Sequence, residues 1–235
     1  MPQAIIFDMD GTLFQTNTIL ELSLQHTFDR LRSLHLWQGE TPIGKYREIM
    51  GVPLPVVWEQ LLPEHSDEIR QQANGVFHEK LIENIMADNG ALYPHAEDVL
   101  SHLADSGCTV FIASNGQAEY LQAIVSHYRL DRWVAETCSI EQMESGNKSD
   151  LVRFIMQKYQ IEEGAVVGDR LSDINAAKDN GLLAVGCDFD FAQATELAQA
   201  DIIIGDLIEL KAIIGVGASQ TGQGREYEGW RWEKR

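Results

Sequence analysis

Asp8 and Asp10 stand where the first apolar run of this chain, residues 4–7, comes to an end. The run predicts a buried strand, and residues two apart on an extended chain project from the same face. Gly11 then permits a sharp turn, so the two carboxylates are held at one point. Close carboxylates repel, which separates their protonation equilibria unless a cation lies between them. One can then serve as nucleophile or metal ligand while the other transfers a proton, although a solvated strand end is the non-catalytic alternative.

A second apolar run, at residues 165–168, repeats this arrangement and delivers Asp169 at its end, with Asp173 four residues later. Asp173 falls in the first turn of an expected helix, where the helix dipole favours a carboxylate. In an open parallel sheet, ligands collect at the carboxyl ends of the strands, so all these acids are expected to share one crevice. Clustered oxygen ligands without Cys or His partners favour Mg²⁺ over zinc or copper.

Groups that could bind an anion lie between the two acidic segments. Ser114 and Asn115 follow the apolar run at residues 109–113, in front of a helix expected over residues 117–128. Hydroxyl and backbone donors at such a turn can bind phosphate oxygens. Lys148 precedes another expected helix and offers an ammonium group. Alone, each of these signals is weak, since a strand-to-helix turn and a solvated lysine are common.

Together these segments resemble the haloacid dehalogenase-like superfamily, in the phosphatase branch that includes phosphoglycolate phosphatases and β-phosphoglucomutases with a helical cap. The resemblance rests on Asp-x-Asp-Gly-Thr at residues 8–12 and Gly-Asp-x-x-x-Asp at residues 168–173, with Ser114 and Lys148 between them. It extends from Ala4 to about residue 214. It implies a Mg²⁺-dependent phosphatase.

By this resemblance, Asp8 would attack phosphorus and become an aspartyl phosphate, while Asp10 would protonate the leaving alcohol and later deprotonate water. Ser114, Asn115 and Lys148 would bind the phosphoryl group. The Mg²⁺ ligands would come from Asp8, the main-chain carbonyl of Asp10, Asp169 and Asp173. Elementary electrostatics agrees, because a dianionic phosphate ester repels a carboxylate nucleophile unless a divalent cation and an ammonium screen the charge.

The order of elements predicts an α/β fold, a doubly wound parallel sheet with an inserted helical cap. Apolar runs that alternate with helices are expected to be strands, at residues 4–7, 109–113, 133–135, 165–168, 183–185 and 202–204. We expect the core domain to comprise residues 1–14 and 89–214 and the cap to comprise residues 15–88. Residues 215–235, rich in Gly, Gln and charge, are expected to form a flexible tail.

The cap should act as a lid, since forming an aspartyl phosphate requires water to be excluded and hydrolysing it requires water to be admitted. Within the cap, Lys45, Arg47 and the turn at residues 50–53 are the candidates for contacting the leaving group; a solvated helix face is the alternative. Four histidines lack metal-ligand spacing and are expected to be surface or packing residues: His26, His35, His65 and His78.

Composition limits the possible partners. A net charge of −18 disfavours nucleic acid and anionic membranes, whose phosphates would be repelled. The chain has no long apolar segment and no export signal, so a cytoplasmic location is expected. Three widely spaced cysteines are expected to be reduced: Cys108, Cys138 and Cys187. The partner should be a small phosphorylated metabolite, and the protein a monomer or homodimer.

Other functions are disfavoured by particular residues. A sugar phosphomutase of the same superfamily carries an Arg-x-Lys-Gly pattern in its cap, and the comparable segment here, residues 48–51, lacks both cations. A dehalogenase has no oxygen leaving group to protonate, so Asp10 argues against it. A phosphoacceptor signalling domain has no large helical insert, and an inactive binding protein would not need all the acids. Phosphoglycolate, a sugar phosphate, a nucleotide monophosphate and pyrophosphate all stay open as substrates.

Overall fold

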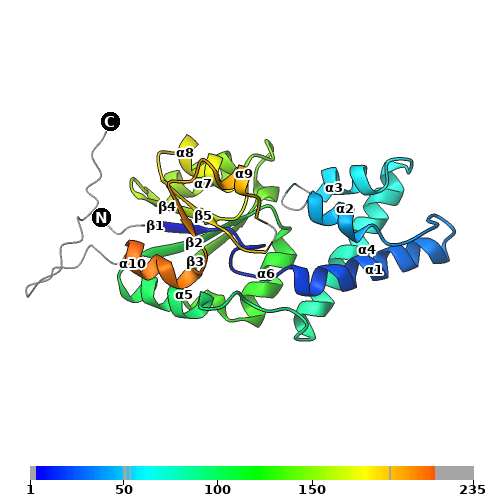
Figure 1. Cartoon of the computed structure of the whole chain (residues 1–235), viewed down its shortest axis with the longest axis horizontal. Coiled ribbons are helices and arrows are strands. Elements are labelled where there is room, and N and C mark those ends of the chain that lie inside the picture. The colour runs from blue at the N-terminus through cyan, green and yellow to red at the C-terminus, as the bar shows by residue number, and fades with distance from the viewer. Residues whose placement is uncertain (1–3, 50–51, 53, 191, 215–235) are drawn as a thin grey trace, which may run out of the picture.

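The computed structural model describes residues 4–49, 52, 54–190 and 192–214. These residues form a parallel sheet with helices around it, and a separate group of helices lies beside this α/β unit (Figure 1). The strands are β1 (Ala4–Phe7), β2 (Thr109–Ser114), β3 (Val134–Ser139), β4 (Gly164–Gly168), β5 (Leu183–Cys187) and β6 (Ile202–Ile204). Their order in the sheet is β3-β2-β1-β4-β5-β6, and every neighbouring pair is parallel. The predicted fold class is confirmed.

The central strand β1 lies between β2 and β4, with Ile5 paired to Val110 on one side and to Ala165 on the other. The chain builds one half of the sheet outward through β2 and β3, then crosses back over β1 to build the other half from β4. Strand order therefore reverses between β1 and β4. Such a switch point opens a crevice at the carboxyl ends of the two strands, where ligands bind in sheets of this kind.

Helices cover both faces of the sheet, which explains why its strands are continuous apolar runs. The helices of this unit are α5 (Ala96–Asp105), α6 (Ala118–His127), α7 (Lys148–Tyr159), α8 (Leu171–Asp179), α9 (Ala194–Leu197) and α10 (Leu210–Ile214). Ile5 and Phe7 pack toward α5 and α6, whereas Ala4 and Ile6 pack toward α7 and α8. Short 3-10 turns add η1 (Leu130–Arg132), η2 (Ile140–Gln142) and η3 (Leu207–Glu209).

The edge strand β3 is longer than the sequence predicts, covering Val134–Ser139 where residues 133–135 were expected. Its middle residues Glu136 and Thr137 are polar and partly exposed, because one side of an edge strand faces solvent. Glu136 pairs with Lys158 at 2.7 Å. An apolar run therefore could not reveal the whole strand.

The separate helical group consists of α1 (Asn17–Ser33), α2 (Ile43–Glu48), α3 (Leu54–Leu61) and α4 (Asp67–Met86). Its core is aromatic, with Trp58 packed edge to face on Phe77 at 5.6 Å between ring centroids. Phe14 forms a bridge with Leu92 where the chain leaves and re-enters the α/β unit. We refer to α1–α4 as the cap. Its exact limits, residues 15–88, stay a prediction.

Two sequence expectations fall outside the described residues: the tail at 215–235 and most of the turn at 50–53, of which Val52 alone is described. None of the helices within the described ranges combines the length and apolar character needed to span a bilayer.

Candidate active site

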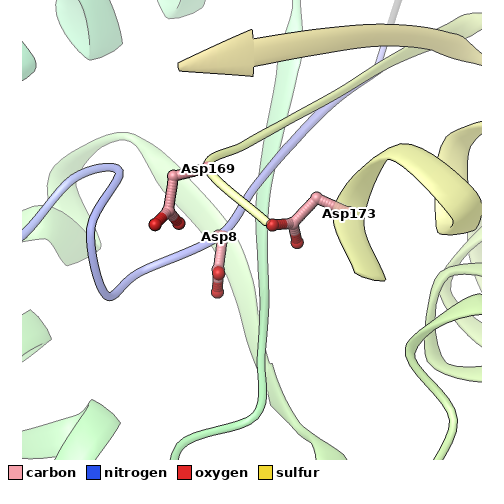
Figure 2. Close-up of side chains that lie close together, drawn as sticks. All are labelled: Asp8, Asp169 and Asp173. Atoms are coloured by element: carbon pink, nitrogen blue, oxygen red, sulfur yellow. The ribbon is translucent and has the colours of Figure 1, made fainter. Parts of the chain in front are cut away.

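Three aspartates converge at the switch point. Asp8 directly follows β1, Asp169 directly follows β4, and Asp173 lies in the first turn of α8. Each offers a carboxylate oxygen, and these oxygens lie within 4.8 Å of one another (Figure 2). All three side chains are buried, Asp173 completely. Segments separated by some 160 residues of chain thus form one acidic cluster, as the strand-end positions predict.

Lys148 is the cation that faces this cluster. Its Nζ lies 2.9 Å from Asp8 Oδ1 and 2.5 Å from Asp173 Oδ1. The lysine begins α7, where the preceding Asn147 caps the helix by accepting a hydrogen bond from the Ser149 backbone at 2.8 Å. This capping hydrogen bond fixes the start of α7, so the otherwise flexible ammonium group of Lys148 is held at a defined position. The Met9 backbone N–H adds a second donor to Asp8 Oδ1, at 2.8 Å.

Two glycines let the carboxylates approach the backbone. A Cβ on Gly11, which has φ +77°, would lie 2.4 Å from an Asp169 carboxylate oxygen. A Cβ on Gly168 would lie 2.1 Å from Asp173 Cγ. Neither contact is sterically possible, so glycine at both positions is required by the close packing of the cluster.

The acidic cluster holds more negative charge than Lys148 can balance. Burial, together with the neighbouring charges of Asp8 and Asp173, raises the pKa of Asp169 well above its ordinary value. Burial also raises the pKa of Asp173, with Lys148 opposing the shift and Asp8 adding to it. For Lys148, burial alone would lower the pKa, but Asp173 and Asp8 raise it, so the amine stays protonated. Buried oxygen donors with excess negative charge fit a hard divalent cation.

Asp10 lies apart from this cluster and faces a pair of hydroxyl groups. Thr16 Oγ1 and Tyr120 Oη each donate a hydrogen bond to Asp10 Oδ1, both at 2.5 Å. Burial raises the pKa of Asp10 to about 6, against the lowering effect of these two hydroxyls. A carboxyl with a pKa near neutrality can both give and take a proton. Tyr120 and Thr16 were not found by sequence reasoning; the only signal was the position of Tyr120 in the helix that follows Ser114 and Asn115.

Ser114 ends β2 and is 1% exposed. Its hydroxyl oxygen accepts a hydrogen bond from the Gly116 backbone at 3.1 Å, while Ser139 donates to the Gly116 carbonyl at 2.6 Å. These bonds fix the turn between β2 and α6. Ser114 and Asn115 line the same cleft as Asp8, Asp10 and Asp169, as predicted from the strand ends.

The α/β unit forms one wall of this cleft, and the cap supplies the other. Lys45 and Arg47, the cap cations predicted to contact substrate, are not part of that wall. Lys45 donates to the Gln60 carbonyl, and Arg47 pairs with Glu21. Because neighbours on a helix project about 100° apart, α2 turns Tyr46 into the cleft and the two cations away from it.

Six cap residues form the wall that faces the acidic cluster, and the sequence assigned none of them to a substrate site except Val52, as part of a turn. They are Tyr46, Val52, Leu54, Phe77, His78 and Leu81. His78 was expected to be a surface or packing residue, and the structure places it in the cleft. Its Nε2 lies 3.7 Å from Glu119 of α6, so it also contacts the α/β unit.

The doubly wound sheet thus brings four carboxylates and a lysine together at its switch point. A family model for haloacid dehalogenase-like hydrolases matches residues 5–187, which includes all of these groups. The chain therefore belongs to the haloacid dehalogenase-like hydrolase family, and the resemblance seen in its sequence is confirmed.

Similar proteins span nearly the whole chain. A phosphoglycolate phosphatase of Vibrio vulnificus (strain CMCP6) is 23% identical over 226 residues, covering 91% of this chain and 96% of its own. A 5′-nucleotidase of Pseudomonas aeruginosa is 24% identical over 216 residues, covering 89% and 94%. A solved structure, titled a predicted phosphoglycolate phosphatase from Haemophilus somnus 129PT, has a TM-score of 0.78 at 20% identity, covering 91% and 98%. At this identity the solved structure supports the fold alone.

Proposed function

We propose that this hydrolase is a Mg²⁺-dependent phosphatase that acts on a small phosphorylated metabolite through an aspartyl phosphate on Asp8. The observation that carries the proposal is the convergence of Asp8, Asp169 and Asp173 within 4.8 Å, beside Lys148. The family and the names of the two relatives, phosphoglycolate phosphatase and 5′-nucleotidase, support it.

The side chains of Asp8, Asp169 and Asp173, with the main-chain carbonyl of Asp10, are the groups we assign to Mg²⁺. The ion would supply the positive charge that lets a dianionic phosphate ester enter an acidic site. Lys148 contributes further positive charge at 2.9 Å from the Asp8 oxygen. We assign Ser114 and Asn115 to the phosphoryl oxygens, because both line the cleft beside Asp8.

In the first chemical step, an oxygen of Asp8 bonds to phosphorus while the bond from phosphorus to the ester oxygen breaks. Asp10 gives its proton to that ester oxygen, and the alcohol departs. In the second step, Asp10 takes a proton from water as the water oxygen bonds to phosphorus and the bond to Asp8 breaks. Inorganic phosphate leaves, and both aspartates return to their starting states. A pKa of about 6 suits Asp10 to both transfers.

The cap wall closes the leaving-group side of the cleft, where it can exclude water during the first step. A phosphomutase is the alternative, and it stays disfavoured because Glu48 and Met50 stand in the sequence where that pattern has its two cations. A phosphoacceptor domain is disfavoured by the four cap helices inserted after β1.

We also propose a cytoplasmic location. The cysteines, which are free in the structure, would stay reduced there, in line with the expectation from the sequence. Whether the protein is a monomer or a homodimer stays a prediction.

The test is phosphate release from a panel of phosphorylated metabolites with Mg²⁺, before and after EDTA, with isomerised products measured in parallel. We expect phosphate release that EDTA abolishes and added Mg²⁺ restores. Isomerised product without net phosphate release would favour the mutase. Turnover unaffected by chelation would contradict the metal assignment.

A further inference from the structure

The cap wall of the cleft is aromatic and aliphatic rather than cationic. Tyr46 and Phe77 lie with their ring centroids 5.6 Å apart, and both line the cleft, as do Leu54 and Leu81. This wall faces the acidic cluster across the cleft, so it borders the space on the leaving-group side of the phosphate. Its chemistry therefore constrains the alcohol part of the substrate.

Each described cation near the cleft's leaving-group side is already matched by an acid or a carbonyl. Arg170 Nε lies 3.0 Å from Glu196, and His78 Nε2 lies 3.7 Å from Glu119, so a protonated His78 would also be paired. Lys45 and Arg47 are engaged away from the cleft. Met50, Gly51 and Pro53 add no charge by sequence.

A leaving group with its own negative charge would therefore enter a site that already holds several carboxylates. It would lose its hydration without gaining a matched cation, which is unfavourable. An uncharged group with an aromatic face would instead pack against Tyr46, whose ring packs on the buried Phe77.

We infer, on the basis of the proposed phosphatase function, that the substrate is a phosphate monoester of an uncharged alcohol bearing an aromatic ring. Nucleoside 5′-monophosphates are metabolites of this class. Phosphoglycolate and pyrophosphate, whose leaving groups carry a further negative charge, are disfavoured by the same wall.

Two matched substrate pairs test the two halves of this inference. Phosphoglycolate and 2-hydroxyethyl phosphate differ only in carboxylate against alcohol, and ribose 5-phosphate and adenosine 5′-monophosphate differ in the aromatic base. We expect kcat/KM with Mg²⁺ to be about tenfold higher for the alcohol than for the carboxylate, and about tenfold higher with the base than without it. Equal values or the reverse order within either pair would overturn the inference while leaving a phosphatase.

If neither the four compounds nor the wider metabolite panel released phosphate, the proposed function itself would be contradicted, and the inference with it. The two failures are therefore distinguishable.

Two pairs of variants locate the effect on the cap wall. Tyr46→Leu should lower kcat/KM for adenosine 5′-monophosphate about tenfold but change that for ribose 5-phosphate little, whereas Tyr46→Phe should keep the preference. Val52 is exposed at the cleft. Val52→Arg should raise kcat/KM for phosphoglycolate relative to 2-hydroxyethyl phosphate, and Val52→Gln should not. An equal loss on both substrates for Tyr46→Leu, or no change in preference for Val52→Arg, would contradict the role of this wall.

Discussion

Tyr120 Oη donates a hydrogen bond to Asp10 Oδ1 at 2.5 Å, across 110 residues of sequence. Thr16 donates to the same oxygen, also at 2.5 Å. With both donors on Oδ1, the carboxyl group cannot rotate freely, and in the proposed mechanism its second oxygen is the one left to exchange a proton with the leaving group or water. Positioning of this kind affects the rate more than substrate affinity.

We therefore expect Tyr120→Phe to lower kcat about tenfold while changing KM little, because Asp10 keeps Thr16 but loses one of its two donors. Steady-state kinetics measures kcat and KM separately. Tyr159→Phe is the matched control, since Tyr159 bonds to Glu136 at the edge of the sheet and should leave both constants unchanged. If Tyr120→Phe raised KM instead of lowering kcat, Tyr120 would be a binding residue rather than a positioning one.

Replacing the proposed nucleophile should abolish turnover without changing the fold. Asp8→Asn keeps the size of the side chain but offers an amide that is not nucleophilic, so we expect kcat to fall by about 10⁴-fold or more. Circular dichroism should be unchanged. The wild-type protein, quenched with acid during turnover, should carry phosphate that hydroxylamine releases, and Asp8→Asn should carry none.

Asp150→Asn is the control for this experiment, because Asp150 forms an exposed ion pair with Arg153 and lies outside the cleft. It should keep full activity and labelling. A labelled Asp8→Asn protein would assign the covalent phosphate to another residue.

The sequence predicts the acidic half of the site well and the cap half poorly, for physical reasons. Buried parallel strands are apolar runs, and parallel strands end at one edge of the sheet, so carboxylates placed after two such runs must lie near each other. Asp8 and Asp169 follow from that rule. The wall opposite depends on how α2 and α4 are rotated and how the cap sits over the sheet, and local sequence does not fix these. Tyr46 and His78 could therefore not be assigned to the cleft beforehand.

The orientation of α2 leads to a further prediction. Lys45→Ala and Arg47→Ala should each leave kcat/KM within about twofold of the wild type, because their charged groups contact Gln60 and Glu21 rather than the cleft. Kinetics on the preferred substrate provides the measurement. A tenfold loss in either variant, with unchanged thermal stability, would restore the sequence-based expectation that these cations reach the substrate when the cap closes.

Metal binding should stabilise the protein in a manner that depends on pH. The pKa of Asp169 and the pKa of Asp173 are raised by burial and by nearby charge, and that of Asp10 is raised to about 6, so the metal-free folded protein holds protons that the unfolded chain has lost. These groups therefore destabilise the metal-free protein at high pH, and the destabilisation is relieved as the pH falls toward 6 and below. Mg²⁺ needs the deprotonated carboxylates, so its stabilising effect should be larger at pH 8 than at pH 6.

Thermal unfolding with and without Mg²⁺ at these two pH values measures this effect. At a concentration 100 times the dissociation constant, the ion should add about 2.7 kcal/mol to the free energy of unfolding, and weaker binding at pH 6 should reduce the gain. Asp169→Asn should lose most of the gain at both pH values, because it removes one ligand from the cluster and part of its charge. Asp150→Asn should retain the full gain. A gain that is the same at pH 6 and pH 8, or that survives in Asp169→Asn, would place the bound ion away from the three aspartates.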